Sequence, residues 1–172
     1  MSSLQPEQAS LLLQTYLAAL RAEQPVTQRI IEAIPTAKSD YKPDAVSKSA
    51  LELAWHVVGS EKMFLDGVLS GTFDFSAMGK PAEITTPEQM AGWYTQMFEE
   101  KTTQVENLSP EQLSGILDFG GIFQLPAVAY LEVSLKHSIH HRGQLSMYLR
   151  PMGAKVPSIY GPSYDTAHAA TA

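Results

Sequence analysis

Long runs of apolar residues at helical spacing constrain the fold of this 172-residue chain more than any other feature. Four segments, at about 6–34, 47–69, 87–107 and 126–153, carry apolar side chains three or four positions apart, which places them on one face of an α-helix. No segment shows the apolar–polar alternation of a half-buried strand. Because amphipathic helices bury their apolar faces against one another, the sequence predicts an all-α fold. We expect one domain over 1–172, a four-helix bundle in up-down-down-up or similar order.

Residues at the helix ends support these segments. Pro6 suits the first helical position, with Gln5 or a neighbouring residue as the cap. Thr86 and Pro87 predict the same kind of start for the third helix. Pro25 lies inside the first apolar pattern. Because proline lacks the N–H of an internal helix bond, we expect a kink or an interruption there.

The connections between the helices are predicted to be irregular. Residues 71–86 carry aromatic residues among glycines and a proline, which indicates a loop with buried aromatic anchors. Residues 117–123 include two adjacent glycines and are expected to be irregular or weakly extended. Aromatic and aliphatic residues within 156–165 predict an ordered C-terminal tail that lies across the bundle, whereas 166–172 are expected to be disordered.

Composition excludes several classes of site and partner. The chain has no cysteine, so disulfides, cysteine–zinc sites and a cysteine nucleophile are excluded. The net charge of -6 argues against a nucleic-acid backbone as the main partner. The N-terminus lacks the basic start and apolar run of a signal peptide, and no apolar stretch approaches the about 20 residues that span a bilayer. We therefore expect a soluble cytoplasmic protein that binds neither nucleic acid nor membrane.

Three of the five histidines lie in the last predicted helix. On a helical wheel of about 100° per residue, His141 lies about 40° from His137 and inside the apolar face. His137 lies at the margin of that face, and His140, at about 300°, lies well outside it. Two imidazoles four positions apart can bind one metal ion, so His137 and His141 are the predicted pair. Ser134 and Ser138 share the inward sector and are candidates for supporting hydrogen bonds.

The alternative is that these histidines are only polar residues at a helix margin. In the second helix, His56 lies at the margin of the apolar stripe, next to Trp55. Glu61 projects into the middle of the same stripe, where a carboxylate must be paired, protonated or near a cation. The third helix adds Trp93, and both tryptophans are expected to be packing residues.

The two residues that follow the histidine pair are predicted to lie at the surface or at an interface. Arg142 is predicted to form a surface or interface ion pair rather than to hold a substrate. Gly143 lies away from the core face of its helix, where it would permit close approach of another helix or subunit. That position would suit a dimer.

Three sequence runs resemble those of a known family. The run His137-Ser-Ile-His-His141-Arg-Gly-Gln144, with Leu-Arg-Pro-Met-Gly153 behind it, resembles the C-terminal signature of the DinB/YfiT-like superfamily. The run Leu53-Ala-Trp-His56-Val-Val-Gly-Ser-Glu61 resembles the first ligand segment of that family. The tail Pro-Ser-Tyr-Asp at 162–165 is similar to that of some members.

The resemblance implies a four-helix bundle, commonly dimeric, in which three histidines hold a divalent metal. Carried onto this sequence, those ligands are His56, His137 and His141. Some relatives in the superfamily are thiol transferases that use bacillithiol, mycothiol or glutathione, and one branch isomerises maleylpyruvate with mycothiol. The resemblance therefore implies a low-molecular-weight thiol as a possible cosubstrate and a homodimer as the assembly.

Three neutral imidazoles would leave at least one coordination position open, as in catalytic sites. Zinc, nickel and iron all accept such nitrogen ligands. The metal could lower the pKa of a bound water to about 7, or bind a thiol as the nucleophilic thiolate. Each ligand also needs an acceptor for its other ring nitrogen. Glu61, Ser134, Ser138 and Gln144 are the candidates, although Glu61 could equally pair with a basic residue on another helix.

These observations leave three functions open. The first is a metal-dependent enzyme, a thiol transferase or hydrolase that acts on a small molecule, with no catalytic residue assigned beyond the metal ligands. The second is a non-catalytic dimeric stress-response protein that binds a metal or a small molecule. The third is an interaction protein whose histidines merely lie at the core margin.

Overall fold

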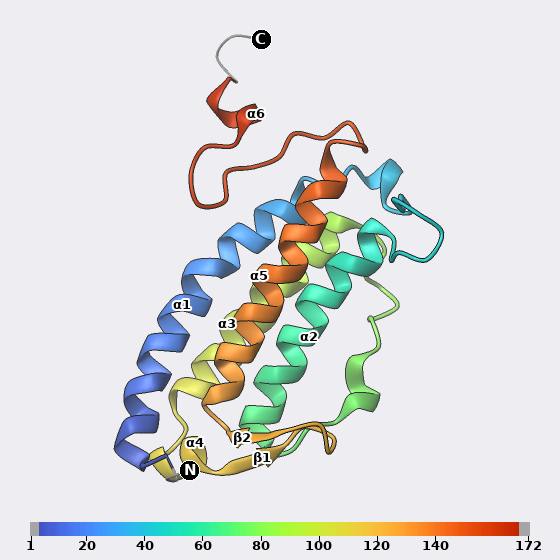
Figure 1. The fold of residues 1–172 in the computed structure, drawn as a ribbon. Coiled ribbons are helices and arrows are strands. Elements are labelled where there is room, and N and C mark those ends of the chain that lie inside the picture. Colours follow the sequence, from blue (N-terminus) through green and yellow to red (C-terminus); the bar gives the residue numbers. More distant parts are fainter. Residues whose placement is uncertain (1–3, 169–172) are drawn as a thin grey trace.

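Four long helices pack side by side in a bundle (Figure 1). The computed structural model describes residues 4–168. Helices α1 (Pro6–Glu32) and α5 (Ala129–Leu149) run in one direction along the bundle, and α2 (Ala50–Ser70) and α3 (Pro87–Glu106) run in the other (Figure 1), so the order is up-down-down-up. Helices α1 and α2 each pack against both α3 and α5. The predicted four-helix bundle is therefore confirmed.

Short elements connect and follow the long helices. The segment predicted to be irregular or weakly extended, 117–123, belongs to a small antiparallel hairpin in which Leu117 pairs with Leu125. Because Pro126 is part of its second strand, α5 begins three residues later than the sequence indicated. The short elements are η1 (Thr36–Lys38), η2 (Phe75–Met78), α4 (Pro110–Ser114), β1 (Ile116–Asp118), β2 (Gln124–Pro126) and α6 (Tyr164–Ala167).

Side-chain caps define the starts of α2 and α3. Thr86 accepts a hydrogen bond from the backbone N–H of Gln89, and the Gln89 side chain accepts one from the Thr86 N–H, as predicted for this start. Ser49 and Glu52 form the same reciprocal pair at α2, which therefore begins at Ala50 rather than near Ser47. Both caps satisfy backbone donors that have no partner within the helix.

Pro25 does not interrupt α1, so the interruption, one of the two expected outcomes, is wrong. The helix continues from Pro6 to Glu32 with Pro25 inside it. Pro25 is exposed, whereas Leu20 and Ile30 on either side of it are buried in the core. The burial of apolar side chains before and after the proline offsets the loss of one backbone hydrogen bond.

The C-terminal tail is ordered through residue 168, as expected for 156–165. The Asp165 carboxylate accepts hydrogen bonds from the Val156 N–H at 2.8 Å and from Arg150 at 3.2 Å. The tail leaves α5 at one end of the bundle, where Val156 and Ile159 pack against the core, and α6 lies beyond that end (Figure 1). Thr166 and Ala167 belong to α6, while the prediction of disorder for 169–172 lies outside the described residues.

The loop after α2 is held by one aromatic anchor. Phe73 is half-buried, and its ring packs at a centroid distance of 4.7 Å from Tyr130 and 4.9 Å from Phe119. Phe75 remains 43% exposed, so the expected burial of aromatic residues in this loop holds for Phe73 and not for Phe75. Of the helices that the structure describes, none has the length and apolar character needed to cross a membrane.

Gly67 leaves the space that the Phe73 ring occupies, and replacing it tests this packing. A Cβ at Gly67 would lie 2.2 Å from the ring, so we expect Gly67→Ala to reduce the free energy of unfolding by about 1–3 kcal/mol. Gly92→Ala is the control, because Gly92 is exposed in α3 with nothing within 4 Å of the added Cβ. For Gly92→Ala we expect the free energy of unfolding to rise by about 0.5–1 kcal/mol, because alanine favours a helix more than glycine does. Equal gains for both variants in urea denaturation would contradict the account.

Candidate metal centre

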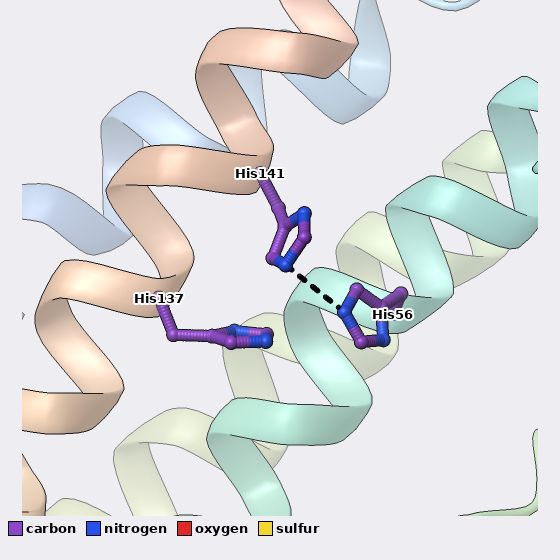
Figure 2. A group of neighbouring side chains, drawn as sticks. All are labelled: His56, His137 and His141. Carbon is purple, nitrogen blue, oxygen red and sulfur yellow. Dashed lines mark hydrogen bonds between the residues drawn. The ribbon is translucent and has the colours of Figure 1, made fainter. Parts of the chain in front are cut away.

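Three histidines from two helices meet at the α2–α5 interface (Figure 2). His137 and His141 lie one turn apart on α5, and His56 faces them from α2 (Figure 2). One ring nitrogen from each lies within 4.8 Å of the others. The Nε2 atoms of His56 and His141 are 3.1 Å apart. The structure thus brings together the pair that the helical wheel favoured and the third histidine that the family resemblance implied.

The donor set suits a divalent metal ion. Zinc–imidazole bonds of about 2.0–2.1 Å in a tetrahedral site place ligand nitrogens roughly 3.4 Å apart. The His56–His141 separation of 3.1 Å is close to this spacing, and the 4.8 Å limit for the whole set requires only small side-chain rotations. The three rings are half-buried, so each side chain keeps some exposed surface.

The electrostatics of the cluster favour the neutral imidazoles that metals bind. Burial, followed by the neighbouring histidines, of which His141 has the largest effect, lowers the pKa of His137 to about 4. Burial, then His141 and Lys48, also lowers the pKa of His56 from its usual 6.5. A low pKa means that protons compete weakly for the nitrogen lone pairs at neutral pH. The two rings can therefore donate to a cation without first losing a proton.

Gln144 orients His141. Its amide Oε1 lies 2.7 Å from His141 Nδ1, which places the proton on Nδ1 and leaves the Nε2 lone pair for the cluster. Of the four predicted supporting residues, Gln144 alone is hydrogen-bonded to a cluster histidine within residues 4–168. Ser134 Oγ and His137 Nδ1 are instead buried atoms with no hydrogen-bond partner among the described residues.

Glu61 faces the bundle core rather than the histidines. Its carboxylate accepts hydrogen bonds from the Tyr94 hydroxyl at 3.0 Å and from the Ser138 hydroxyl at 3.1 Å. No hydrogen bond joins it to the three histidines in the described part of the chain, so its suggested role beside the metal ligands is not supported. Burial raises the pKa of Glu61 to about 7, although Tyr94, Ser138 and Arg142 each oppose this rise.

Arg142 forms an ion pair, but not at the surface. Its guanidinium is buried, with Nη1 2.5 Å from the Glu23 carboxylate and Nη2 donating to the Tyr160 hydroxyl at 2.7 Å. The prediction of a surface or interface position was wrong because α1 and the C-terminal tail cover this residue. The helical wheel already indicated this burial, because Arg142 lies about 140° from His137 and therefore only about 70° from the centre of the apolar face.

Two clefts border the histidine cluster. A cleft of about 710 Å³ is lined by His56, Trp55 and the 78–80 segment, and a second of about 450 Å³ is lined by His141 and Gln144. The segment 42–49 contributes to both. The sequence did not predict the clefts, because they form where loops without periodic patterns fold over α2 and α5.

Trp55 is a packing residue, as expected, and also a wall of the larger cleft. Its indole packs against Trp93 at a centroid distance of 5.1 Å and donates a hydrogen bond from Nε1 to the Met78 carbonyl at 3.0 Å. A Cβ at Gly59 would lie 2.9 Å from the same indole. These contacts hold the indole of Trp55 in place, and Trp55 directly precedes His56 in the sequence.

Comparison with known proteins identifies the family. The model of the DinB family matches residues 6–171. The chain belongs to the DinB family. It is 32% identical over 131 residues to the protein YjoA of Bacillus subtilis (strain 168), which is described as uncharacterized, covering 74% of this chain and 82% of YjoA. It is 24% identical over 161 residues to YrdA of the same organism, also described as uncharacterized, covering 89% and 90% of the two chains.

Solved structures of DinB-like proteins share the fold. The crystal structure of YjoA from Bacillus subtilis matches with a TM-score of 0.70 and 26% identity, covering 86% of this chain and 99% of that chain. A DinB-like protein from Bacillus cereus ATCC 10987 matches with a TM-score of 0.72 and 22% identity, covering 86% and 97%. DinB membership agrees with the resemblance seen in the sequence and with the observed bundle, and the homodimer stays a prediction.

Replacing Glu61 tests its place in the core through the pH dependence of stability. Because its pKa rises from 4.5 to about 7 on folding, the folded chain keeps a proton that the unfolded chain releases between these pH values. This carboxyl therefore makes the free energy of unfolding fall as pH rises through that window, and Glu61→Gln removes the effect. We expect the stability of the variant relative to wild type to rise by up to about 3 kcal/mol from about pH 5 to about pH 8.

Urea denaturation at each pH gives the measurement, and Glu83→Gln at an exposed carboxylate controls for the loss of one charge. A stability difference between Glu61→Gln and wild type that stays constant with pH would contradict the raised pKa.

Proposed function

We propose that this DinB protein is a metal-dependent enzyme that holds a divalent ion, zinc, nickel or iron, on His56, His137 and His141. The proposed reactions are transfer of a thiol to a small molecule and hydrolysis of a small molecule. The observation that carries the proposal is the convergence of ring nitrogens from α2 and α5 within 4.8 Å, beside two clefts that are lined by His56 and by His141.

The ligand count supports a catalytic rather than a purely structural site. Structural zinc sites are closed by four protein ligands, whereas catalytic sites use three and leave a position for a water or a substrate. Within residues 4–168, the three histidines form a cluster to which no cysteine, aspartate or glutamate adds a fourth ligand. A bound divalent ion would supply Lewis acidity that favours the deprotonated form of a thiol or a water.

The protein residues supply position and access. His56, His137 and His141 hold the ion, and Gln144 fixes the tautomer of His141 by accepting its Nδ1 proton. The two clefts admit the reactants next to the cluster. Because the chain has no cysteine, the thiol in a transfer reaction must come from a low-molecular-weight cosubstrate.

Removing one ligand tests the proposal. We expect purified wild-type protein to bind one divalent ion per chain and to catalyse attack of a small thiol on an aryl halide, in which sulfur bonds to the ring carbon, halide leaves and the thiol proton goes to solvent. Hydrolysis of an activated ester is measured in parallel. His141→Ala should lower metal affinity by more than the about 10- to 100-fold typical of losing a supporting residue, and turnover should fall with it.

His140→Ala is the matched control, because His140 is the exposed neighbour of His141 and lies outside the cluster. It should keep both metal and turnover. Unchanged metal content in His141→Ala would contradict the site, and metal binding without turnover of any thiol or ester would contradict the enzyme.

The alternative is a non-catalytic protein whose metal is structural. The position of the cluster between two packed helices favours it, since an ion there would cross-link α2 and α5. A structural ion contributes folding free energy, so its removal by a chelator should lower the melting temperature strongly. Our proposal instead predicts that chelation lowers the melting temperature by only a few degrees and abolishes turnover. Calorimetry on loaded and chelated protein measures the melting temperature, and the thiol and ester assays measure turnover.

A further inference from the structure

Lys48 lies where the two clefts meet. It lines the cleft that contains His56 and also the cleft that contains His141. In the smaller cleft it is the only residue with a formal charge among the described lining residues, apart from the histidine itself. Lys48 and one histidine of the cluster therefore line each cleft, so an anion bound in either cleft lies in the same cleft as both.

The ammonium group of Lys48 has no bonding partner among the described residues, unlike those of the two other lysines in the larger cleft. Three lysines line the larger cleft. Lys42 forms an ion pair with Glu52 at 3.6 Å, and Lys80 donates a hydrogen bond to the Ile84 carbonyl. Lys48 has neither an ion pair nor a hydrogen bond to any residue between 4 and 168. In a chain with a net charge of -6, this places an unpaired cation in the lining of both clefts.

The larger cleft combines this charge with an apolar wall. Trp55, Leu51 and Met78 contribute apolar surface, and the Trp55 ring is fixed by its bond to the Met78 carbonyl. A volume of about 710 Å³ suits a small molecule rather than a polymer. The Asp40 and Glu52 carboxylates also line this cleft, and Glu52 pairs with Lys42. With Lys48 beside the apolar wall, the surface matches a molecule with one anionic group and a short apolar portion.

We propose that Lys48 is the anion-binding residue of this site and selects small carboxylate-bearing ligands. The ligand carboxylate pairs with the Lys48 ammonium while the opposite end of the molecule reaches the histidine cluster. The inference rests on the proposed function for the metal at that opposite end. It adds a specificity determinant that the three ligands alone do not provide.

Binding to cobalt-loaded protein tests the proposal. The probes are 3-mercaptopropionate and its neutral counterpart 3-mercaptopropionamide, which share the thiol and differ in charge. Their binding is followed by the visible bands of cobalt and the ultraviolet band of a cobalt–thiolate bond. We expect the wild type to prefer the carboxylate, and Lys48→Gln to reduce this preference by about threefold to tenfold. Added salt should reduce the wild-type preference as well.

Lys155→Gln is the control, since this exposed lysine lines neither cleft and its loss changes the net charge equally. It should keep the wild-type preference. Equal affinity of the wild type for both probes, or an unchanged preference in Lys48→Gln, would overturn the role of Lys48 while thiol binding to cobalt still supports the metal site. No spectral change with either thiol would overturn the proposed thiol chemistry and this inference with it.

Discussion

The site depends on the packing of α2 against α5. One helix can present two imidazoles on the same face, at positions four apart, but it cannot by itself close a three-ligand set around one ion. The third ring, His56, comes from the antiparallel neighbour, so its position is set by how α2 and α5 align. The Glu61–Ser138 hydrogen bond at 3.1 Å joins the same two helices at the residue next to His137. A slide of either helix by one turn, about 5.4 Å, would separate the histidines.

Buried polar groups connect this pair to the rest of the bundle. Glu61 is held by Tyr94 of α3 as well as by Ser138 of α5, and Arg142 of α5 pairs with Glu23 of α1. Such groups are costly to bury unless they are hydrogen-bonded, so each contact permits few alternative arrangements. The network thus favours a single relative placement of the four helices, and with it a single placement of the ring nitrogens.

The helical periodicity of the sequence predicted the regular elements of the fold. The four helices and the pairing of His137 with His141 on one side of a helix follow from spacing, because a helix turns by a fixed angle per residue. The cap at Thr86 follows from its residue type and the proline after it. The choice of His56 as the third ligand came from resemblance, since spacing within one helix says nothing about the neighbour. The interruption expected at Pro25 is absent because tertiary burial outweighs a local backbone preference. The burial of Arg142 and the two clefts depend on the tail and on loops that carry no periodic signal.

The most direct test of the central claim is X-ray absorption spectroscopy at the zinc edge of the zinc-loaded protein. The account predicts three imidazole nitrogens at about 2.0–2.1 Å from the zinc ion, with outer-shell scattering from three rings. The same measurement on His56→Ala should show two rings. A zinc ion with fewer than three imidazoles in the wild type, or an unchanged ring count in His56→Ala, would contradict the convergence of α2 and α5 on one metal.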